Sequence, residues 1–198
     1  MNSGTIVSND LKLRCWWCGE DSTYVSYHDS EWGVPVHEDR RLFEKLVLEG
    51  FQSGLSWITI LRKRHAFREV FLDFSPESVA ALRDRDVNRL LLDARIIRHR
   101  GKIEAAISNA RAYTELVARE GAFSGFVWRF APSRPVVRRR RSDVPSSSVE
   151  SVAFSKELRR RGWRFVGPTT AYAFFQAMGL VNDHLHDCFR YAEVAAER

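Results

Sequence analysis

Glu49 is the residue that first suggests chemistry, because it stands where a helical pattern asks for an apolar side chain. At roughly 100° per residue, Leu42, Leu46 and Glu49 share one face of a helix predicted over 39–51. A buried carboxylate is costly unless it is paired or hydrogen-bonded. Two interpretations stay open: Glu49 reaches solvent at the helix end or caps a neighbour, or it serves a ligand site.

The residues that follow Glu49 suit close contact with a flat ligand. Gly50 and Gly54 carry no side chain, so another group can approach the backbone closely there. Trp57 then offers an aromatic face on which a ring can stack. The stretch 48–57 is therefore a candidate ligand site.

A second chemical signal is a set of cysteine and histidine residues near the two ends of the chain. His184 and Cys188 have the i, i+4 spacing that brings two side chains to one face of a helix. Cys15 and Cys18 form a Cys-x-x-Cys pair that could supply two more ligands. Thiolate and imidazole together suit Zn²⁺, and four protein ligands make a zinc site structural. Such an ion would tie the two chain ends together.

Spacing leaves alternatives to this ligand set. His28 and His186 are further candidates, although the spacing favours the Cys-x-x-Cys pair with His184 and Cys188. Buried thiols and surface histidines that bind no metal are the other interpretation.

A basic segment, 93–103, is the candidate contact with an anionic partner. Arg98, Arg100 and Lys102 lie where a short predicted helix joins a long one. Backbone N–H groups at a helix N-terminus can hold a phosphate, whereas basic side chains there oppose the helix dipole. That mismatch favours an anionic partner over an ordinary helix start. The four-arginine run 138–141 is expected to be a solvated face that adds only non-specific, salt-dependent attraction to DNA.

Length and composition permit a folded domain with a real core. The chain has 198 residues, 44% of them hydrophobic, and a formal net charge of +6. Basic charge with many aromatic residues suggests nucleic acid, although charge alone is weak support. No apolar run reaches about 18 residues, and residues 1–12 lack a signal-peptide core, so we expect a cytoplasmic protein without a membrane span. The three cysteines are then not expected to form structural disulfides.

Hydrophobic spacing predicts an all-α fold, because few segments alternate with period two. Ser75 with Pro76 marks one helix start, and Ser147 with Glu150 resembles a capping box at another. Segment 123–130 is ambiguous between strand and helix, and 131–148 is predicted to be a loop. Residues 1–13 are predicted to be a flexible extension, and 14–35 a loop with short helical turns. Helices are predicted over 39–51, 53–67, 78–82, 86–92, 100–119, from the capping box to 161, over 169–178, and in a last short segment that holds His184 and Cys188.

Taken together, these residues resemble a known family. The matching motifs are Arg14-Cys15, Tyr27-His28-Asp29-x-Glu31-Trp32-Gly33, Leu48-Glu49-Gly50 with Gly54-Leu55-Ser56-Trp57-Ile58, Ile96-Ile97-Arg98-His99-Arg100-Gly101-Lys102-Ile103, and Phe165-Val166-Gly167 with Asn182-Asp183-His184. The chain resembles the constitutive, type I 3-methyladenine DNA glycosylases of the helix-hairpin-helix superfamily. The resemblance covers 14–191, taken as the glycosylase domain, with 192–198 as a C-terminal tail.

The resemblance implies a different set of metal ligands. One structural Zn²⁺ would be bound by Cys15, His28, His184 and Cys188, which leaves Cys18 outside the set. It also implies a base pocket formed by the catalytic Glu49 with aromatic residues. These are Tyr27 and Trp57, with Trp32, Trp17 and Tyr24 as further lining residues.

The resemblance also implies which residues grip DNA. The hairpin residues are Ile97, Arg98, His99, Arg100, Gly101 and Lys102. Gly54 and Leu55 are added, with Leu55 either probing the gap left by a flipped base or serving as a core residue. Two positions depart from the family pattern. Arg95 stands where the family usually has Gly, which suggests an altered or strained turn, and Phe51 stands where it usually has Gln, close to the pocket.

The function implied is excision of 3-methyladenine from alkylated double-stranded DNA. The enzyme would flip the base out and hydrolyse its N-glycosidic bond, without cleaving the strand, and is expected to be a monomer. A zinc-containing DNA-binding module without catalysis and a small-molecule hydrolase with an aromatic pocket are the alternatives.

Overall fold

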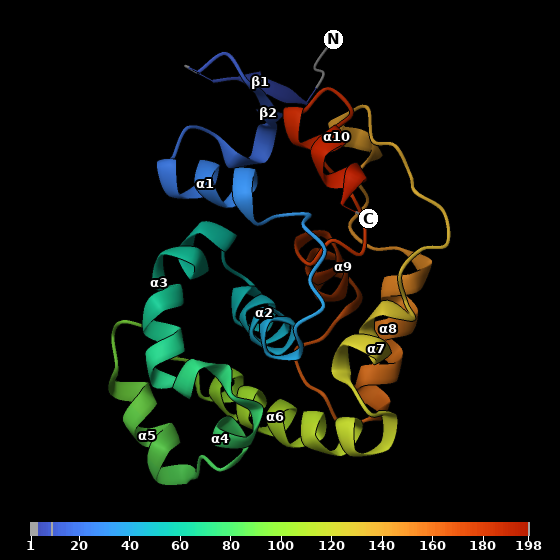
Figure 1. Ribbon diagram of the computed structural model, residues 1–198. Helices are drawn as coiled ribbons and strands as arrows, with labels where there is room; N and C mark the ends of the chain where they lie inside the picture. Colours follow the sequence, from blue (N-terminus) through green and yellow to red (C-terminus); the bar gives the residue numbers. More distant parts are fainter. Residues whose placement is uncertain (1–3, 9, 198) are drawn as a thin grey trace.

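Helix α2 (Asp39–Gln52) runs through the middle of the molecule in the computed structural model, which describes residues 4–8 and 10–197 (Figure 1). Every residue from Leu42 to Phe51 is buried, so the helix is covered on all sides. Helices α3 (Trp57–Val70), α6 (Arg100–Glu120) and α9 (Pro168–Ala177) pack against it. Glu49 is buried with Leu42 and Leu46, which excludes the interpretation that it reaches solvent at the helix end.

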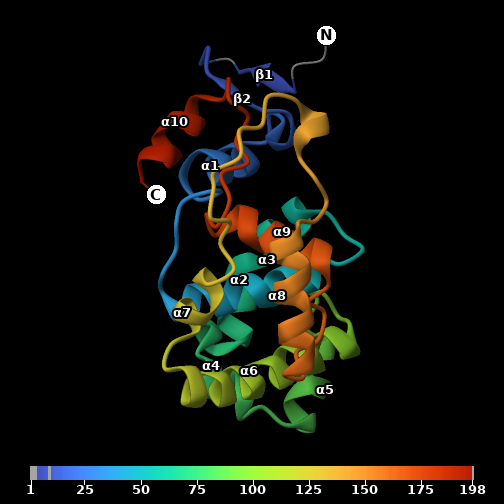
Figure 2. The same ribbon diagram turned by 90° about the vertical axis from the view of Figure 1, so that its right-hand side faces the viewer.

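Four of the remaining helices lie at the two ends of the molecule (Figure 2). Helix α1 (Ser22–Ser30) and α10 (Phe189–Ala196) lie at one end, and α4 (Pro76–Ala80) and α5 (Asp84–Leu92) lie with α6 at the other. Between them are α7 (Phe123–Trp128) and α8 (Val149–Arg160), and short 3₁₀ turns occur at Trp16–Cys18, Leu72–Phe74 and Arg141–Asp143. No helix among the described residues has the length and apolar character that a membrane crossing requires.

Several predicted helix starts shift by a few residues. Ser75 caps α4 with Pro76 at its first position, as predicted. The capping box of α8 is formed by Ser148 and Ser151, one residue after the predicted pair, because the side chain of Ser148 accepts from the N–H of Ser151. Helix α3 begins at Trp57 instead of residue 53, since a turn with Gly54 at φ +79° separates it from α2. The ambiguous segment 123–130 is mainly helical, as α7.

The N-terminal segment differs from the predicted loose extension. Strand β1 (Thr5–Val7) pairs antiparallel with β2 (Leu13–Cys15), so the fold is all-α apart from one two-stranded sheet. Strands of three residues have too little sequence to reveal a period of two, and β2 is held here by contacts with α10. Residues 1–3 and 9 of the predicted extension lie outside the described residues.

The C-terminal segment also differs from the prediction. His184 and Cys188 do not share a helix, because Cys188 is the N-cap of α10. The segment between them is held by a bridge between Leu185 and Arg138 and by a turn in which the N–H of Cys188 donates to Leu185. Helix α10 reaches Ala196, so most of the predicted tail 192–198 is helical, and residue 198 lies outside the described residues.

Candidate active site and metal centre

Four cysteine and histidine side chains converge at the end of the molecule that holds both chain termini. Cys15 ends β2, His28 lies in α1, and His184 and Cys188 flank the turn before α10. All four are buried, and their ligand atoms lie within 4.8 Å of one another. Cys18 is also buried, but its thiol donates to the Cys15 carbonyl at 3.2 Å and takes no part in the cluster. The cluster thus has the composition implied by the resemblance, and not the Cys-x-x-Cys set that spacing favours.

The separations in this cluster fit a tetrahedral ion. With metal–sulfur and metal–nitrogen bonds of about 2.3 and 2.1 Å, a tetrahedral site has sulfur–nitrogen edges of about 3.6 Å. The Sγ of Cys188 lies 3.5 Å from Nε2 of His28 and 3.6 Å from Nδ1 of His184, and the Sγ of Cys15 lies 3.8 Å from Nδ1 of His184. Hydrogen bonds from the Cys15 thiol and the two imidazoles hold the pKa of the Cys188 thiol well below its usual range. The residues present therefore fit a metal ion.

A second layer of contacts orients both imidazoles. Nδ1 of His28 lies 2.8 Å from Oδ1 of Asp29, and Arg14 holds that carboxylate at 2.7 Å. Nε2–H of His184 donates to the backbone carbonyl of Trp32 at 2.9 Å. These partners leave the opposite ring nitrogens directed at the cluster, as in metal sites whose histidines have a carboxylate or carbonyl partner.

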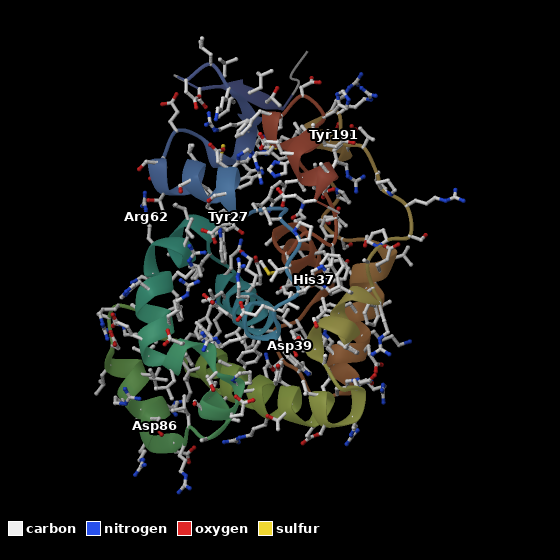
Figure 3. All side chains as sticks on the ribbon, in the orientation of Figure 1. Tyr27, His37, Asp39, Arg62, Asp86 and Tyr191 are labelled. Carbon is white, nitrogen blue, oxygen red and sulfur yellow. The ribbon has the colours of Figure 1, made fainter. Side chains whose placement is uncertain are left out.

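An aromatic cavity of about 280 Å³ opens beside the metal centre. It contains all the aromatic residues predicted for the base pocket together with Glu49. Tyr27 points from α1 toward the helices below it, where Trp57 begins α3 (Figure 3). The predicted members are Tyr27, Glu49, Trp57, Trp32, Trp17 and Tyr24, and the further lining residues are Trp16, Gln52, Val144, Pro145, Ala173, Gln176 and Asp183.

The aromatic wall connects the cavity to the metal centre. The ring of Trp17 lies 5.0 Å from Tyr24, 4.9 Å from Trp32 and 5.3 Å from His28, between ring centroids. Trp32 in turn makes an edge contact with His184 at 4.7 Å. Rings packed against two ligands cannot shift without moving those ligands, so an ion at the centre would fix this wall of the cavity. Burial raises the pKa of Tyr24 to about 12, so its hydroxyl stays protonated at neutral pH.

Glu49 is buried in the cavity wall beside Lys45, a partner that was not predicted from the sequence. Its Oε1 lies 2.7 Å from the ammonium of Lys45, one helical turn earlier in α2. The same ammonium donates to the Tyr27 hydroxyl at 2.9 Å. The i, i+4 spacing of the two residues in α2 was the signal available in the sequence.

Two positions of the 48–57 stretch serve packing instead of the cavity. A Cβ at Gly50 would lie 3.3 Å from Cβ of Phe165, so Gly50 allows α2 to approach that residue closely. Phe51 faces the core, with its ring 4.7 Å from that of Phe67, which corrects its expected place close to the pocket. Gln52, the next residue, lines the cavity.

Two predicted DNA-contact elements, the hairpin and the turn with Gly54 and Leu55, are each held by hydrogen bonds from a lysine side chain. Nζ of Lys63 donates to the carbonyls of Ala94 and Arg95 in the hairpin, at 3.1 and 3.0 Å. Lys102 differs from its predicted surface role, because it is buried and its Nζ donates to the carbonyls of Phe51 and Ser53. The turn that presents Gly54 and Leu55 is therefore tied to the start of α6.

The outer residues of these elements are open to solvent. Arg98, His99 and Arg100 are exposed, and Nδ1 of His99 accepts from the N–H of Lys102 as the N-cap of α6. Ile97 is half-buried, and Gly101 packs against the His99 ring. Leu55 is 42% exposed, which excludes a core role.

Arg95 does not strain the hairpin. Its φ is not among the positive values of non-glycine residues, contrary to the suggestion of a strained turn. Its side chain forms ion pairs with Asp93 and Glu69.

One member of the arginine run is a structural residue and not part of a solvated face. Nε of Arg138 lies 2.9 Å from Oδ1 of the buried Asp183, whose other oxygen accepts from Tyr172 at 2.6 Å and from Gln176 at 2.9 Å. Arg139 to Arg141 are exposed, as expected. This ion pair anchors the loop that brings Val144 and Pro145 to the cavity.

Comparison with known proteins identifies relatives along most of the chain. The family model described as methyladenine glycosylase matches residues 17–191. The DNA-3-methyladenine glycosylase 1 of Escherichia coli (strain K12) is 50% identical over 180 residues, which cover 90% of this chain and 96% of that protein. The DNA-3-methyladenine glycosylase of Haemophilus influenzae is 46% identical over 180 residues, which cover 90% of this chain and 97% of that protein.

Solved structures agree with these matches. A crystal structure of 3-methyladenine DNA glycosylase I has a TM-score of 0.86 and 48% identity, covering 89% of this chain and 98% of that one. A structure on 3-methyladenine recognition by the Staphylococcus aureus enzyme has a TM-score of 0.83 and 38% identity, covering 85% of this chain and 91% of that one. The chain therefore belongs to the methyladenine glycosylase family.

Proposed function

We propose that this protein releases 3-methyladenine from alkylated double-stranded DNA by hydrolysing the N-glycosidic bond. The observation that carries the proposal is the aromatic cavity with a buried carboxylate, Glu49, in its wall. Its family membership supports the same reaction, as does a related glycosylase whose structure holds 3-methyladenine (TM-score 0.84, 36% identity, covering 87% of this chain and 94% of that one).

Selection of the base follows from charge and stacking. Methylation at N3 leaves the adenine base of DNA positively charged, and a damaged base costs less to flip out of the helix. Trp57 and Tyr27 offer aromatic faces to a cationic ring. Glu49 can accept a hydrogen bond from the exocyclic amine, and a charged acceptor strengthens that bond.

Bond cleavage needs little acid catalysis, because the positive charge makes the base a good leaving group. The C1′–N bond breaks with its electron pair passing to the base, and water adds to C1′ and loses a proton. DNA phosphates and the Glu49 carboxylate would stabilise the positive charge that develops on the sugar. The described residues that line the cavity include no lysine, which supports hydrolysis without strand cleavage.

The metal centre has a structural role in this proposal. We assign one Zn²⁺ to Cys15, His28, His184 and Cys188, because two thiolates and two imidazoles are a donor set typical of closed zinc sites. Four protein ligands leave no position for a reacting water. We expect a monomer, since one chain supplies the whole cavity and the whole ligand set. Its similarity to a bacterial DNA-3-methyladenine glycosylase supports a cytoplasmic protein.

DNA would be held by the hairpin and the neighbouring turn. Exposed Arg98 and Arg100 with the N-terminus of α6 offer phosphate contacts. Leu55, exposed at the tip of the turn, would enter the gap left by the flipped base.

The test is to incubate the protein with methylated duplex DNA and to quantify free 3-methyladenine and strand breaks. We expect release of the base from methylated DNA only, with the strand left intact. DNA binding without release would contradict the enzyme and support a DNA-binding module. Strand breaks that accompany release would contradict simple hydrolysis.

A further inference from the structure

Lys45 is a buried cation that contacts three residues assigned to the base pocket. Its ammonium lies 2.7 Å from Oε1 of Glu49, 2.9 Å from the Tyr27 hydroxyl, and 3.1 Å from the centroid of the Trp57 ring. The side chain is only 7% exposed. A desolvated ammonium against an indole face is a strong cation–π contact. Lys45 therefore contacts a carboxylate, a phenol hydroxyl and an indole ring of the base pocket at the same time.

Lys45 contacts these residues from a second, smaller cavity and not from the base pocket. Tyr27 and Trp57 line both the base pocket and a smaller cavity of about 30 Å³, whereas Lys45 lines only the smaller one. The ammonium thus contacts the Trp57 ring from the smaller cavity and not from the base pocket. One oxygen of Glu49, Oε1, faces Lys45, which leaves Oε2 for a ligand.

The charges around this contact come from three helices and one loop. Within α2, Glu44 pairs with Arg68 of α3. Glu31, at the end of α1, pairs with Arg64 of α3, and Tyr24 and Tyr27 of α1 lie nearby. Arg41 of α2 lines the smaller cavity with Lys45, and Asp183, which pairs with Arg138, lines the base pocket with Glu49. Each of these ion pairs is neutral, and among the described residues Lys45 is the only cation bonded directly to Glu49.

We propose that Lys45 is a positioning residue for base recognition, which acts through Glu49 by holding its carboxylate with Oε2 turned to the base. This inference rests on the proposed function and adds a residue to it. Burial lowers the pKa of Lys45 to about 8, so the ammonium is largely charged at pH 7.5 and below. A buried carboxylate that loses its cation takes up a proton more readily. Without Lys45, binding of the base should therefore become sensitive to pH.

The experiment compares the wild-type protein with Lys45→Met, Lys45→Arg and the exposed control Lys156→Met. Binding of free 3-methyladenine is measured by tryptophan fluorescence at pH 5.5 and pH 7.5, and circular dichroism checks the fold. Protonation of the ligand affects the variant and the wild type equally, so it cancels in the ratio of their dissociation constants. We expect this ratio for Lys45→Met to be about tenfold larger at pH 5.5 than at pH 7.5. Lys45→Arg and Lys156→Met should give ratios that do not change with pH.

A second comparison tests whether Lys45 acts through Glu49. Lys45→Met combined with Glu49→Gln removes both charges, so it leaves no unpaired buried ion even where Lys45→Met alone does not fold. We expect this double variant to bind 3-methyladenine within about twofold of Glu49→Gln alone, as coupled residues do. A large further loss in the double variant, or a pH-independent ratio for Lys45→Met, would overturn the inference. A wild-type protein that binds no 3-methyladenine would overturn the proposed function and the inference with it.

Discussion

At the scale of single residues, the main feature is a buried carboxylate, Glu49, whose charge is balanced by a buried lysine. Glu49 lies in a helix that is buried on all sides, where an unpaired charge would be strongly destabilising. Lys45, one turn earlier, supplies the opposite charge. Because this pair is neutral, recognition of a cationic base here would depend on the Glu49 oxygen that is not bonded to Lys45 and on aromatic stacking.

Glu49→Gln should reduce the rate of 3-methyladenine release by roughly 10- to 100-fold, the loss expected for one hydrogen bond to a charged group. The fold and the metal content should be retained, because the amide oxygen can still accept from Lys45. Single-turnover assays on methylated DNA, with metal analysis of the purified protein, measure both quantities.

Glu115→Gln is the matched control, since this glutamate is exposed on α6. Its release rate should equal that of the wild type. Full activity in Glu49→Gln, or loss of its fold, would refute the role given to Glu49.

At the scale of elements, two lysine side chains, the half-buried Lys63 and the buried Lys102, organise the surface assigned to DNA. Lys63 binds carbonyls of the hairpin, and Lys102 binds carbonyls of the turn between α2 and α3. Lys102 satisfies carbonyls at the buried end of α2 that would otherwise lack donors, whereas Lys63 binds carbonyls at an exposed part of the hairpin. Basic residues in this region thus divide into those that shape the backbone and those, such as Arg98, that are left free to meet phosphate.

Arg98→Ala and Lys102→Met should therefore weaken DNA binding in different ways. Arg98→Ala removes a phosphate contact, so the slope of log affinity against log salt should fall by about 1. Lys102→Met should lower affinity and release rate with the slope unchanged, because its ammonium is bonded to carbonyls. Titrations of fluorescent duplex DNA across a salt series give both slopes. Equal changes of slope would show that Lys102 contacts phosphate after all.

At the scale of the whole molecule, the metal centre joins the beginning of the chain to its end. Cys15 and His28 come from the N-terminal segment, and His184 and Cys188 from the C-terminal one. An ion bound there would close a loop of most of the chain and so restrict the unfolded state. It would also support the aromatic wall of the cavity, because Trp17 and Trp32 pack on His28 and His184.

His28→Ala should lower zinc content and reduce the free energy of unfolding by roughly 3 kcal/mol or more, as loss of a metal does. Cys18→Ala is a matched control at a buried thiol outside the cluster, and should cost about 1 kcal/mol with zinc content unchanged. Zinc analysis and urea unfolding of both variants measure these effects. Equal loss of zinc in the two variants would restore the Cys-x-x-Cys pair as ligands.

The long, strongly periodic elements could be predicted from the sequence. The helices expected over 39–51 and 100–119 match α2 and α6 closely, because one apolar face repeats over several turns in each. The same periodicity placed Glu49 on the face of Leu42 and Leu46, but left open whether its carboxylate reaches solvent. The metal set followed from the family resemblance, whereas spacing alone favoured Cys18, whose thiol bonds instead to a carbonyl.

Only the tertiary structure decided which charged side chains turn inward. Lys102 meets Phe51 and Ser53 from about fifty residues away, and Arg138 meets Asp183 from a similar separation. A long flexible side chain can snorkel to water or reach a distant carbonyl or carboxylate, and local sequence does not distinguish these outcomes. Periodicity records which face of an element is apolar, while the partner of a buried charge depends on which distant segment packs there.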